Sequence, residues 1–475
     1  MKRLLLASVL VCLALSGAPL HRAQARLIRQ DNSGTGVDAR SAQVDALMAA
    51  VVKENSPGAA VMVIRDGKVL HSKGYGLARL DTKEPVGTGT AFELSSTSKP
   101  FTALAAMLLV RQGKLSLDDP LSKFFPAFPA YAKKITVRHL LNHTSGLVDA
   151  LDPKWFRKGY EPTAKDFAVM MAKEKTVRSE PGEKFEYNNA GYVLLALIVE
   201  KASGQPFARF MKESIFKPLG MNDTFIYDES KPSAARMAVS YFFEDNQFKP
   251  YLPTSDTFLY GAKGVVSTLE DMYRWEMAIE SGKLLEPSLL KQTFTPARLT
   301  NGMETTYGFG WYVYKDNGLD VYEHPGGYYA YRANIRRYPG LRTTVILLSN
   351  NALVEPVQLA RKIAQIYVGD AAAQSAAAAV EISEAILKEY AGKYEGDPSV
   401  MPNLIIEVTL EGNELYITSP IKPKTKLIAQ SATEFQIAET ASTVTFKRDD
   451  KGTVAGLTLK TRRGLVEAKK LQPSQ

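Results

Sequence analysis

A helix that is apolar on every side follows the segment Ser96-Thr97-Ser98-Lys99. Pro100 suits the first turn of a helix, and from Phe101 onward apolar residues recur at the i, i+3, i+4, i+7, i+8 spacing of one helical face. Further apolar residues fill the opposite face: Ala103, Ala106, Met107 and Val110. A helix with no polar face is buried inside a protein. We therefore expect a central helix that ends near Gly113, with a large core around it.

Ser96 and Lys99 lie at the mouth of this helix. A spacing of three residues is about one helical turn, so the hydroxyl and the amine share a face. Serine is a poor nucleophile until a neighbouring group accepts its proton, and a partly desolvated lysine has a pKa low enough to do so. Free backbone N–H groups at a helix start also suit a developing oxyanion. The alternative is a capping serine beside a solvated lysine, but the buried helix favours the catalytic interpretation.

Residues 1–25 have the pattern of a secretory signal peptide. Lys2 and Arg3 form a basic start, Leu4–Leu15 an apolar run and Ala23-Gln24-Ala25 a cleavage site. Cys12, the single cysteine of this 475-residue chain, lies inside that run, so we expect no disulfide or thiol chemistry in the mature protein. No later run is long and apolar enough to predict a transmembrane segment. We expect an exported bacterial protein, periplasmic or secreted.

The net charge of +9 says little about partners. Lys2, Arg3 and Arg22 contribute three of these charges, so the mature chain is mildly basic. No basic cluster with interleaved aromatic residues is present, and we expect no nucleic-acid partner. The remaining charge fits anionic cell-wall polymers or membranes, although a role in solubility alone is the simpler interpretation. The sequence does not predict the oligomeric state.

Strand-like segments at both ends of a helical middle predict an α+β domain over residues 41–370. Ala59–Ile64 and Lys68–Lys73 are joined by Asp66-Gly67, a strong hairpin signal, and Leu319–Asn350 is again rich in strand formers. We expect one antiparallel sheet, covered on both faces and flanked by a helical subdomain. Further helices are expected at Val44–Glu54, at Asn189–Ala202 and from Ser267 or Thr268 through Ile279. Residues Ile135–Leu147 are expected to form a short helix that ends at a tight turn.

A change of pattern marks a second domain. The alanine-rich residues 371–382 predict a linker or the end of a helix. Residues 383–475 contain short strands separated by turns such as Glu411-Gly412-Asn413, which is typical of a small all-β barrel or sandwich. That region contains no catalytic constellation. Ahead of the first domain, the polar residues 26–40 predict a flexible leader.

Two other segments carry candidate site residues. Tyr187 and Asn189 precede an apolar helix, where a phenol could shuttle the serine proton and an amide could hold the lysine and a substrate carbonyl. The alternative is a packed tyrosine beside a helix cap. His324-Pro325-Gly326-Gly327 precedes a strand-rich segment, where small residues allow close approach of a substrate backbone and Pro325 argues for a sheet edge. The alternative there is an ordinary glycine turn.

His139 and His143 stand at i, i+4, a spacing that can bind zinc on a helix face. No acid beside them completes an H-E-x-x-H pattern. We therefore expect structural hydrogen-bonding roles for both histidines, and neither a metal nor an organic cofactor.

The order Ser96-x-x-Lys99, Tyr187-x-Asn189, His324-x-Gly326 resembles the serine β-lactamase/penicillin-binding superfamily. The similarity is to the class C β-lactamase-like branch, which includes D-alanyl-D-alanine carboxypeptidases, D-amino-acid peptidases and amidases, and carboxylesterases. It extends in order from about Val44 to Val368. Further matching segments are Leu140–Leu147, Pro218–Met221, Gly264–Thr268 and Tyr307–Trp311. The C-terminal strands resemble the small β-module often appended to such hydrolases.

This resemblance implies a role for each candidate residue. Ser96 is the acylated nucleophile, and Lys99 and Tyr187 share its proton, with the identity of the base left open. Asn189 orients Lys99 and the substrate. The backbone N–H groups of Ser96 and Gly327 form the oxyanion hole. His324, Pro325 and Gly326 occupy the third motif.

The third motif departs from that of true β-lactamases of the branch, which have Lys-Thr-Gly there. His324 is mostly neutral near pH 7 and Pro325 offers no hydroxyl, so recognition of a substrate carboxylate is weakened. We therefore expect a serine hydrolase of esters or peptide-like amides, such as an esterase, amidase or D-aminopeptidase-like enzyme. Its expected substrate is a small molecule or a peptide-like compound, with cell-wall fragments among the candidates. The alternatives are a D-alanyl-D-alanine carboxypeptidase or weak class C β-lactamase, and a non-catalytic penicillin-binding or cell-wall sensor protein.

Overall fold

The computed structural model describes residues 39–472 except 153–154, 156–161, 228–236, 252–258, 378–379, 397–403, 421, 439, 441 and 463. The predicted signal peptide and the predicted leader up to residue 38 lie outside the described residues. Residues 39 and 40, assigned above to the leader, begin helix α2 (Ala39–Val51). Among the described helices, none combines the length and apolar character that crossing a membrane requires.

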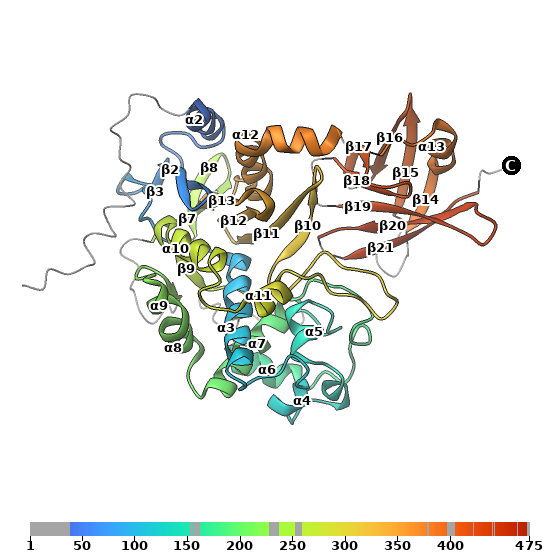
Figure 1. The fold of residues 1–475 in the computed structure, drawn as a ribbon. Coiled ribbons are helices and arrows are strands. Elements are labelled where there is room, and N and C mark those ends of the chain that lie inside the picture. The colour runs from blue at the N-terminus through green and yellow to red at the C-terminus, as the bar shows by residue number, and fades with distance from the viewer. Residues whose placement is uncertain are drawn as a thin grey trace, which may run out of the picture. The chain divides into compact units, whose positions relative to one another are not determined.

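A six-stranded antiparallel sheet joins the two ends of the first domain, as predicted (Figure 1). Its order is β10-β11-β12-β13-β1-β2, so β1 near the start of the domain pairs with β13 near its end, in a register that places Ala59 opposite Ser349. The Asp66-Gly67 turn has φ angles of 50° and 73° and connects β1 to β2, which confirms the hairpin. The strands are β1 (Ala59–Arg65), β2 (Lys68–Tyr75), β10 (Tyr312–Asp316), β11 (Leu319–Tyr328), β12 (Tyr331–Tyr338) and β13 (Thr343–Ser349).

Alternate residues of β1 enter two separate cores. Val61 and Val63 pack with α2 and with α12 (Pro356–Ala377) on one face, while Met62 and Ile64 pack with the helical subdomain on the other. Because a strand presents successive side chains to opposite faces, an unbroken apolar run is what a doubly covered strand requires. The expectation of two covered faces is correct for β1 but not for β2, which is the edge strand and is mostly only half-buried.

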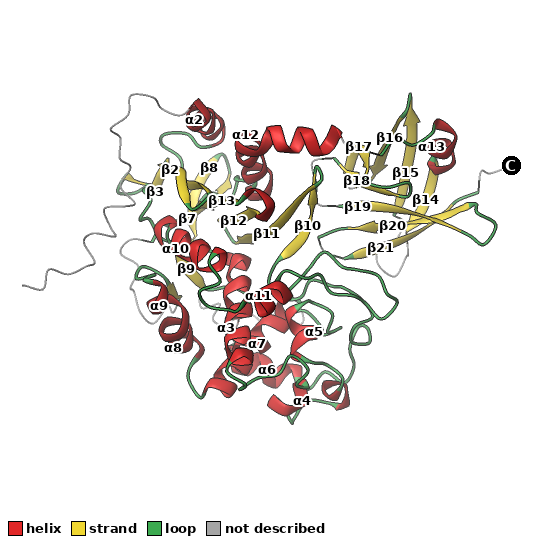
Figure 2. Ribbon diagram, viewed as in Figure 1, coloured by secondary structure: helices red, strands yellow, loops and turns green. Residues whose placement is uncertain are grey.

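The helical subdomain packs around α3 (Lys99–Arg111), whose residues are buried from Lys99 to Leu109 (Figure 2). Helix α7 (Asn189–Ser203) lies against it and ends at Gly204, where a φ of 71° makes the left-handed cap that glycine adopts without strain. The other described helices of this domain are α4 (Leu121–Phe124), α5 (Val137–Leu141), α6 (Ala164–Met171), α8 (Phe207–Met211), α9 (Lys217–Leu219), α10 (Leu269–Glu280) and α11 (Pro287–Thr293).

Short strands connect the sheet and the helices. A three-stranded sheet of order β5-β9-β6 lies beside the start of α3, and two hairpins, β3-β4 and β7-β8, complete the domain. Their bounds are β3 (Leu77–Arg79), β4 (Glu84–Pro85), β5 (Phe92–Glu93), β6 (Phe225–Ile226), β7 (Ser240–Glu244), β8 (Gln247–Tyr251) and β9 (Val265–Ser267).

The segment Ile135–Leu147 forms a short helix followed by a tight turn, as predicted. Helix α5 covers Val137–Leu141 only, and the chain then turns through His143 and Gly146, whose φ angles are 59° and 69°. Positive φ values cannot continue a right-handed helix. The two histidines therefore do not share a helix face.

The C-terminal strands form a closed barrel rather than a sandwich. Its first strand, β14, and helix α13 (Glu384–Tyr390) were not predicted from the sequence. Helix α12 extends to Ala377, so part of the alanine-rich segment is helical. The barrel strands are β14 (Gly392–Gly396), β15 (Ile405–Glu411), β16 (Glu414–Ser419), β17 (Lys422–Ala429), β18 (Glu434–Ile437), β19 (Thr443–Arg448), β20 (Val454–Lys460) and β21 (Leu465–Lys470).

Replacing Phe101 with alanine is expected to destabilise the protein by about 3–5 kcal/mol, because a fully buried ring leaves a cavity. The Phe101 ring stacks on Trp275 with centroids 3.8 Å apart and meets Phe216 edge-on at 6.1 Å. Urea unfolding followed by tryptophan fluorescence measures the change. Val169→Ala is the control, since Val169 is 61% exposed and its truncation is expected to cost less than about 0.5 kcal/mol. Equal losses in the two variants would contradict the assignment of Phe101 to the core.

Candidate active site

Ser96 lies in a 3₁₀ turn, Ser95–Ser98, between β5 and α3. The turn begins with Ser95 in the left-handed region, with a φ of 52°. The Ser95 hydroxyl donates to Oε2 of buried Glu93 at 3.0 Å, and Oε1 of the same carboxylate accepts the Gly264 N–H at 2.9 Å. A non-glycine residue holds this conformation only when its surroundings fix it. Glu93 thus fixes the turn that presents Ser96.

Lys99 is fully buried one turn further on, and its amine makes three hydrogen bonds. Nζ contacts Ser96 Oγ at 3.2 Å, Asn189 Oδ1 at 2.9 Å and the Ala262 carbonyl oxygen at 3.0 Å. The last two partners can only accept a hydrogen bond, whereas the serine hydroxyl can donate one. When the amine is neutral, its two protons go to Asn189 and Ala262, and its lone pair faces the Ser96 hydroxyl.

Asn189 is itself held in place by Asp149. The backbone N–H of Asn189 donates to Asp149 Oδ2 at 2.6 Å, and its side-chain Nδ2 donates to Oδ1 at 3.3 Å. Because the carboxylate takes the amide N–H₂, the amide oxygen must point the other way, toward Lys99. Asp149 was not predicted from the sequence, because no local pattern marks it. The Ala262 carbonyl was not predicted either, since any residue type supplies that group.

Tyr187 contacts both members of the pair. The Ser96 side chain lies beside the Tyr187 hydroxyl, and the centroid of the Tyr187 ring lies 4.8 Å from Lys99 Nζ. Tyr312 stacks on the Tyr187 ring with centroids 6.1 Å apart and planes 9° from parallel. The phenol is therefore fixed between the serine and an aromatic wall.

Burial affects the pKa values of the two candidate bases in opposite ways. Desolvation lowers the pKa of Lys99 to about 7, although the nearby Asp149 and Glu93 carboxylates oppose this shift. Burial, with a further contribution from Tyr312, raises the pKa of Tyr187 well above its ordinary value. At neutral pH, the phenol is protonated and about half of the lysine is a neutral amine.

His324 to Gly327 form a local edge of the sheet. Strand β10 pairs with β11 only as far as Glu323, so from His324 onward β11 pairs with β12 alone. Pro325 therefore lies in a stretch of β11 that has a partner strand on one side only, in agreement with the predicted edge. The Thr97 hydroxyl donates to the His324 carbonyl at 3.1 Å, which ties this edge to the Ser96 turn.

The His324 ring is neutral, and both of its nitrogens have hydrogen-bond partners within the protein. Its Nδ1 lies 2.8 Å from the Pro325 carbonyl, which only accepts, so this nitrogen carries the proton. Its Nε2 lies 2.9 Å from the Tyr307 hydroxyl, which then donates. Burial and the nearby Lys99 lower the pKa of His324 to about 3. The ring is therefore not a cation at neutral pH.

A cleft of about 730 Å³ brings these segments together. Six of the seven predicted site residues line it: Ser96, Tyr187, Asn189, His324, Gly326 and Gly327. The seventh, Lys99, is fully buried next to Ser96. Charged residues of both signs share the wall, among them Asp149, Glu186, Lys263 and Arg332.

The two predicted structural histidines make hydrogen bonds. Nδ1 of His139 accepts the Thr136 N–H at 3.2 Å in a capping box, and Nδ1 of His143 accepts the Asn188 N–H at 3.1 Å. Within the described parts of the chain, no group of three histidine, cysteine or acidic residues is placed to hold a metal ion.

The model of the family described as Beta-lactamase matches residues 42–367. Penicillin-binding protein 4* of Bacillus subtilis (strain 168) is 33% identical over 395 residues, which cover 79% of this chain and 86% of that protein. The octameric penicillin-binding protein homologue from Pyrococcus abyssi has a TM-score of 0.62 at 24% identity and covers 91% of this chain and 99% of its own. D-amino acid amidase from Ochrobactrum anthropi SV3 has a TM-score of 0.57 at 23% identity over 69% of this chain and 99% of its own. The two structural likenesses establish the fold alone.

Gly326→Ala is expected to lower the free energy of unfolding by about 1–3 kcal/mol, since overpacking forces the backbone to move. A Cβ at this position would lie 2.1 Å from the Leu94 carbonyl oxygen, between the β11 edge and the Ser96 turn. Thermal unfolding measures the loss. Gly327→Ala is the matched control, because a Cβ there meets only the Arg332 side chain at 3.9 Å. A Gly326→Ala protein as stable as the Gly327→Ala protein would show that the two segments do not pack this closely.

Proposed function

This chain belongs to the Beta-lactamase family, and from that premise we propose that it is an exported serine hydrolase that cleaves an ester or a peptide-like amide through an acyl-enzyme on Ser96. The observation that carries the proposal is the arrangement of acceptors around Lys99. Asn189 and Ala262 take the two protons of a neutral amine and leave its lone pair for the serine hydroxyl. Export is supported by the basic start, apolar run and cleavage site within residues 1–25.

In the proposed reaction, Ser96 Oγ attacks the substrate carbonyl carbon while its proton passes to Lys99 Nζ. The resulting oxyanion accepts hydrogen bonds from the N–H groups of Ser96 and Gly327. When the tetrahedral intermediate collapses, the leaving oxygen or nitrogen takes a proton from Lys99 through the Tyr187 hydroxyl. Water then attacks the acyl-enzyme by the reverse proton path and regenerates Ser96. The high pKa of the phenol suits a proton relay that is never itself the resting base.

The third motif supports an ester or amide over a β-lactam. Both ring nitrogens of His324 are already hydrogen-bonded inside the protein, and Pro325 has no hydroxyl. Neither residue is therefore available to bind the carboxylate that β-lactams and D-alanyl-D-alanine peptides carry. A substrate without that carboxylate does not need such a partner, so its binding in this cleft is not weakened.

A second candidate activity, D-alanyl-D-alanine carboxypeptidase or weak β-lactamase, is favoured by two other cations. Lys263 and Arg332 line the cleft, and Lys263 Nζ lies 4.2 Å from the Tyr328 ring centroid, next to Gly327. A carboxylate bound by these residues would compensate for the neutral third motif. The relative named penicillin-binding protein 4* agrees with this candidate.

The rate of Ser96 acylation is expected to rise with pH, to be half-maximal near pH 7 and to level off above it, because only neutral Lys99 accepts the serine proton and its pKa is about 7. The burst of p-nitrophenol from p-nitrophenyl acetate measures this rate. Lys99→Ala is expected to slow acylation by about 10²–10⁴-fold. Lys99→Arg should be equally slow, since it keeps the charge but cannot give up its proton. A wild-type rate that begins to rise only above pH 9 would instead identify Tyr187 as the base.

Hydrolysis of p-nitrophenyl acetate or D-alanyl p-nitroanilide is expected to exceed that of nitrocefin by about tenfold or more in kcat/KM, because the lactam carboxylate lacks its usual partner. Initial rates with the three substrates test the order, and Ser96→Ala should abolish all three activities. Faster turnover of nitrocefin would support the second candidate. Failure to hydrolyse any substrate, together with no mass adduct on Ser96 after treatment with a fluorophosphonate, would favour a non-catalytic binding protein.

A further inference from the structure

The turn between barrel strands β20 and β21 contacts the segment that carries Tyr187. Gly464 forms an isolated antiparallel bridge with Glu186, the residue before Tyr187. Leu465 packs against the aromatic cluster around Phe185, Tyr187 and Tyr307. The barrel therefore contacts the site from behind the cleft wall.

Arg462, in the same turn, reaches a carboxylate at the base of the third motif. Its Nη2 donates to Glu323 Oε2 and, at 2.9 Å, to the Tyr314 hydroxyl. Glu323 is fully buried and directly precedes His324 in β11. Its other oxygen accepts Asn334 Nδ2 at 2.9 Å and Arg336 Nη1 at 3.1 Å.

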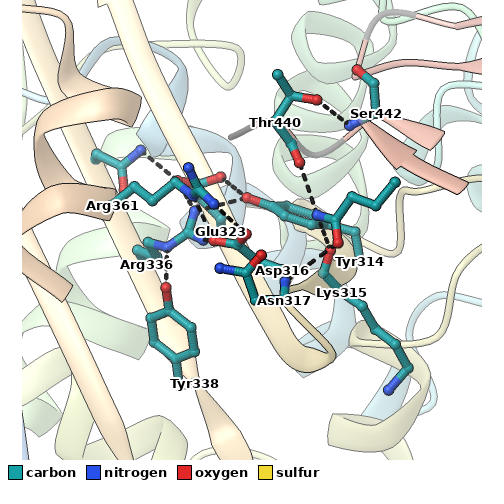
Figure 3. A network of polar contacts seen from close by, with 12 residues as sticks. Tyr314, Lys315, Asp316, Asn317, Glu323, Arg336, Tyr338, Arg361, Thr440 and Ser442 are labelled. Carbon is teal, nitrogen blue, oxygen red and sulfur yellow. Dashed lines mark hydrogen bonds and ion pairs between the residues drawn. The ribbon is translucent and has the colours of Figure 1, made fainter. Parts of the chain in front are cut away.

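The charges around Glu323 show that Arg462 helps to compensate the charge of this buried carboxylate. Arg336 is shared, because it also pairs with Asp316, which in turn binds Arg361 through both carboxylate oxygens at 2.8 Å and 2.9 Å (Figure 3). Arg462 is thus the cation that Glu323 does not share with Asp316. Burial opposes ionisation of Glu323, but Arg462 and Arg336 outweigh it and lower the pKa of this carboxyl to about 2. Removing one partner of a buried charge network leaves an uncompensated charge.

The same guanidinium supports the other wall of the site. It lies 5.8 Å from the centroid of the Tyr312 ring, which stacks on Tyr187. Tyr312 is also paired with Glu323 in the β10–β11 ladder. Arg462 therefore contacts groups adjacent to both His324 and Tyr187.

A second contact holds the barrel to the same hairpin. Gln436 of β18 donates to the Lys315 carbonyl at 2.9 Å and accepts the Asn317 N–H at 3.3 Å. Figure 3 shows this end of the β10–β11 hairpin, with Lys315, Asp316 and Asn317, beside Thr440 of the barrel. The barrel thus binds the hairpin at its tip and, through Arg462, at the start of the third motif.

We propose that Arg462 is a positioning residue for the Ser96 reaction, through which the C-terminal barrel holds the Glu323–Gly327 segment and the Tyr312–Tyr187 pair in their reactive geometry. This inference rests on the proposed acyl-enzyme chemistry. Arg462 is not among the described residues that line the cleft. It therefore acts through Glu323 and Tyr312 and not on substrate. A displacement of about 1 Å at a reacting group reduces rates by up to about 10²-fold.

Inactivation of the full-length protein by a fluorophosphonate tests the proposal, with the maximal inactivation rate separated from the inhibitor constant. Arg462→Ala is expected to lower the maximal rate by about 10- to 100-fold and to leave the inhibitor constant within about twofold. Arg462→Lys should restore part of the rate, since it keeps the charge. Arg448→Ala is the matched control: this barrel arginine pairs with Glu389 inside the barrel, and its loss should leave the rate unchanged.

A double-mutant cycle with Glu323→Gln identifies the path. If Arg462 acts through this carboxylate, Arg462→Ala should cost less in the Glu323→Gln background than in the wild type. Additive losses, or an Arg462→Ala protein as fast as Arg448→Ala, would overturn the proposal. If Arg462→Ala does not fold, the Arg462→Lys variant tests the proposal instead. A maximal inactivation rate equal to that of the wild type in Arg462→Lys would then overturn the proposal. A wild-type protein that is not labelled at Ser96 would reject the acyl-enzyme proposal itself, which is a separate result.

Discussion

The desolvation of the Lys99 amine is the constraint on which the rest of the site depends. An ammonium group excluded from water is unfavourable, so the fold must either neutralise it or surround it with acceptors. Here both occur, because the apolar helix α3 removes water while Asn189 and Ala262 accept its protons. Asp149 then fixes the orientation of Asn189. The same burial lowers the pKa of the lysine and raises the pKa of Tyr187, so one physical effect favours the neutral form of both neighbouring groups.

The site lies where the helical subdomain meets the sheet, and neither part contains it alone. The Ser96 turn belongs to the start of α3, whereas Gly326 and Gly327 belong to the stretch of β11 that β10 leaves unpaired. Their close approach depends on a glycine, since the Leu94 carbonyl occupies the space that a side chain at 326 would need. An exposed strand edge beside a reactive hydroxyl is suited to an extended substrate backbone, which can pair with the strand while its carbonyl faces Ser96.

The barrel has its own core, and its sequence shows no catalytic constellation, yet its contacts reach the residues next to the site. Glu323 explains how. A buried carboxylate in the strand that carries the third motif needs cations, and one of them comes from the barrel. Such a network specifies geometry more than it adds stability, because the desolvation of each charge offsets most of the attraction. We therefore propose that the contacts between the two domains align the candidate site more than they reinforce the fold.

Local patterns in the sequence were sufficient for the antiparallel sheet, the central helix and the β-rich C-terminal region, and the spacing of the predicted site residues led to the family. Hydrophobic periodicity and turn residues act over a few positions, so the chain displays them directly. Asp149 and Arg462 could not be found this way, because Arg462 meets Glu323 across 139 residues and no periodicity encodes such a pair. The short helix and tight turn expected within Ile135–Leu147 are present, but the partners of that turn could not be predicted: Nδ1 of His143 accepts the Asn188 N–H, and the Gly146 carbonyl accepts the Arg178 N–H. The sequence by itself determined which groups can react. Only the tertiary structure decided their protonation and alignment, because burial and charge partners arise from segments that are distant along the chain.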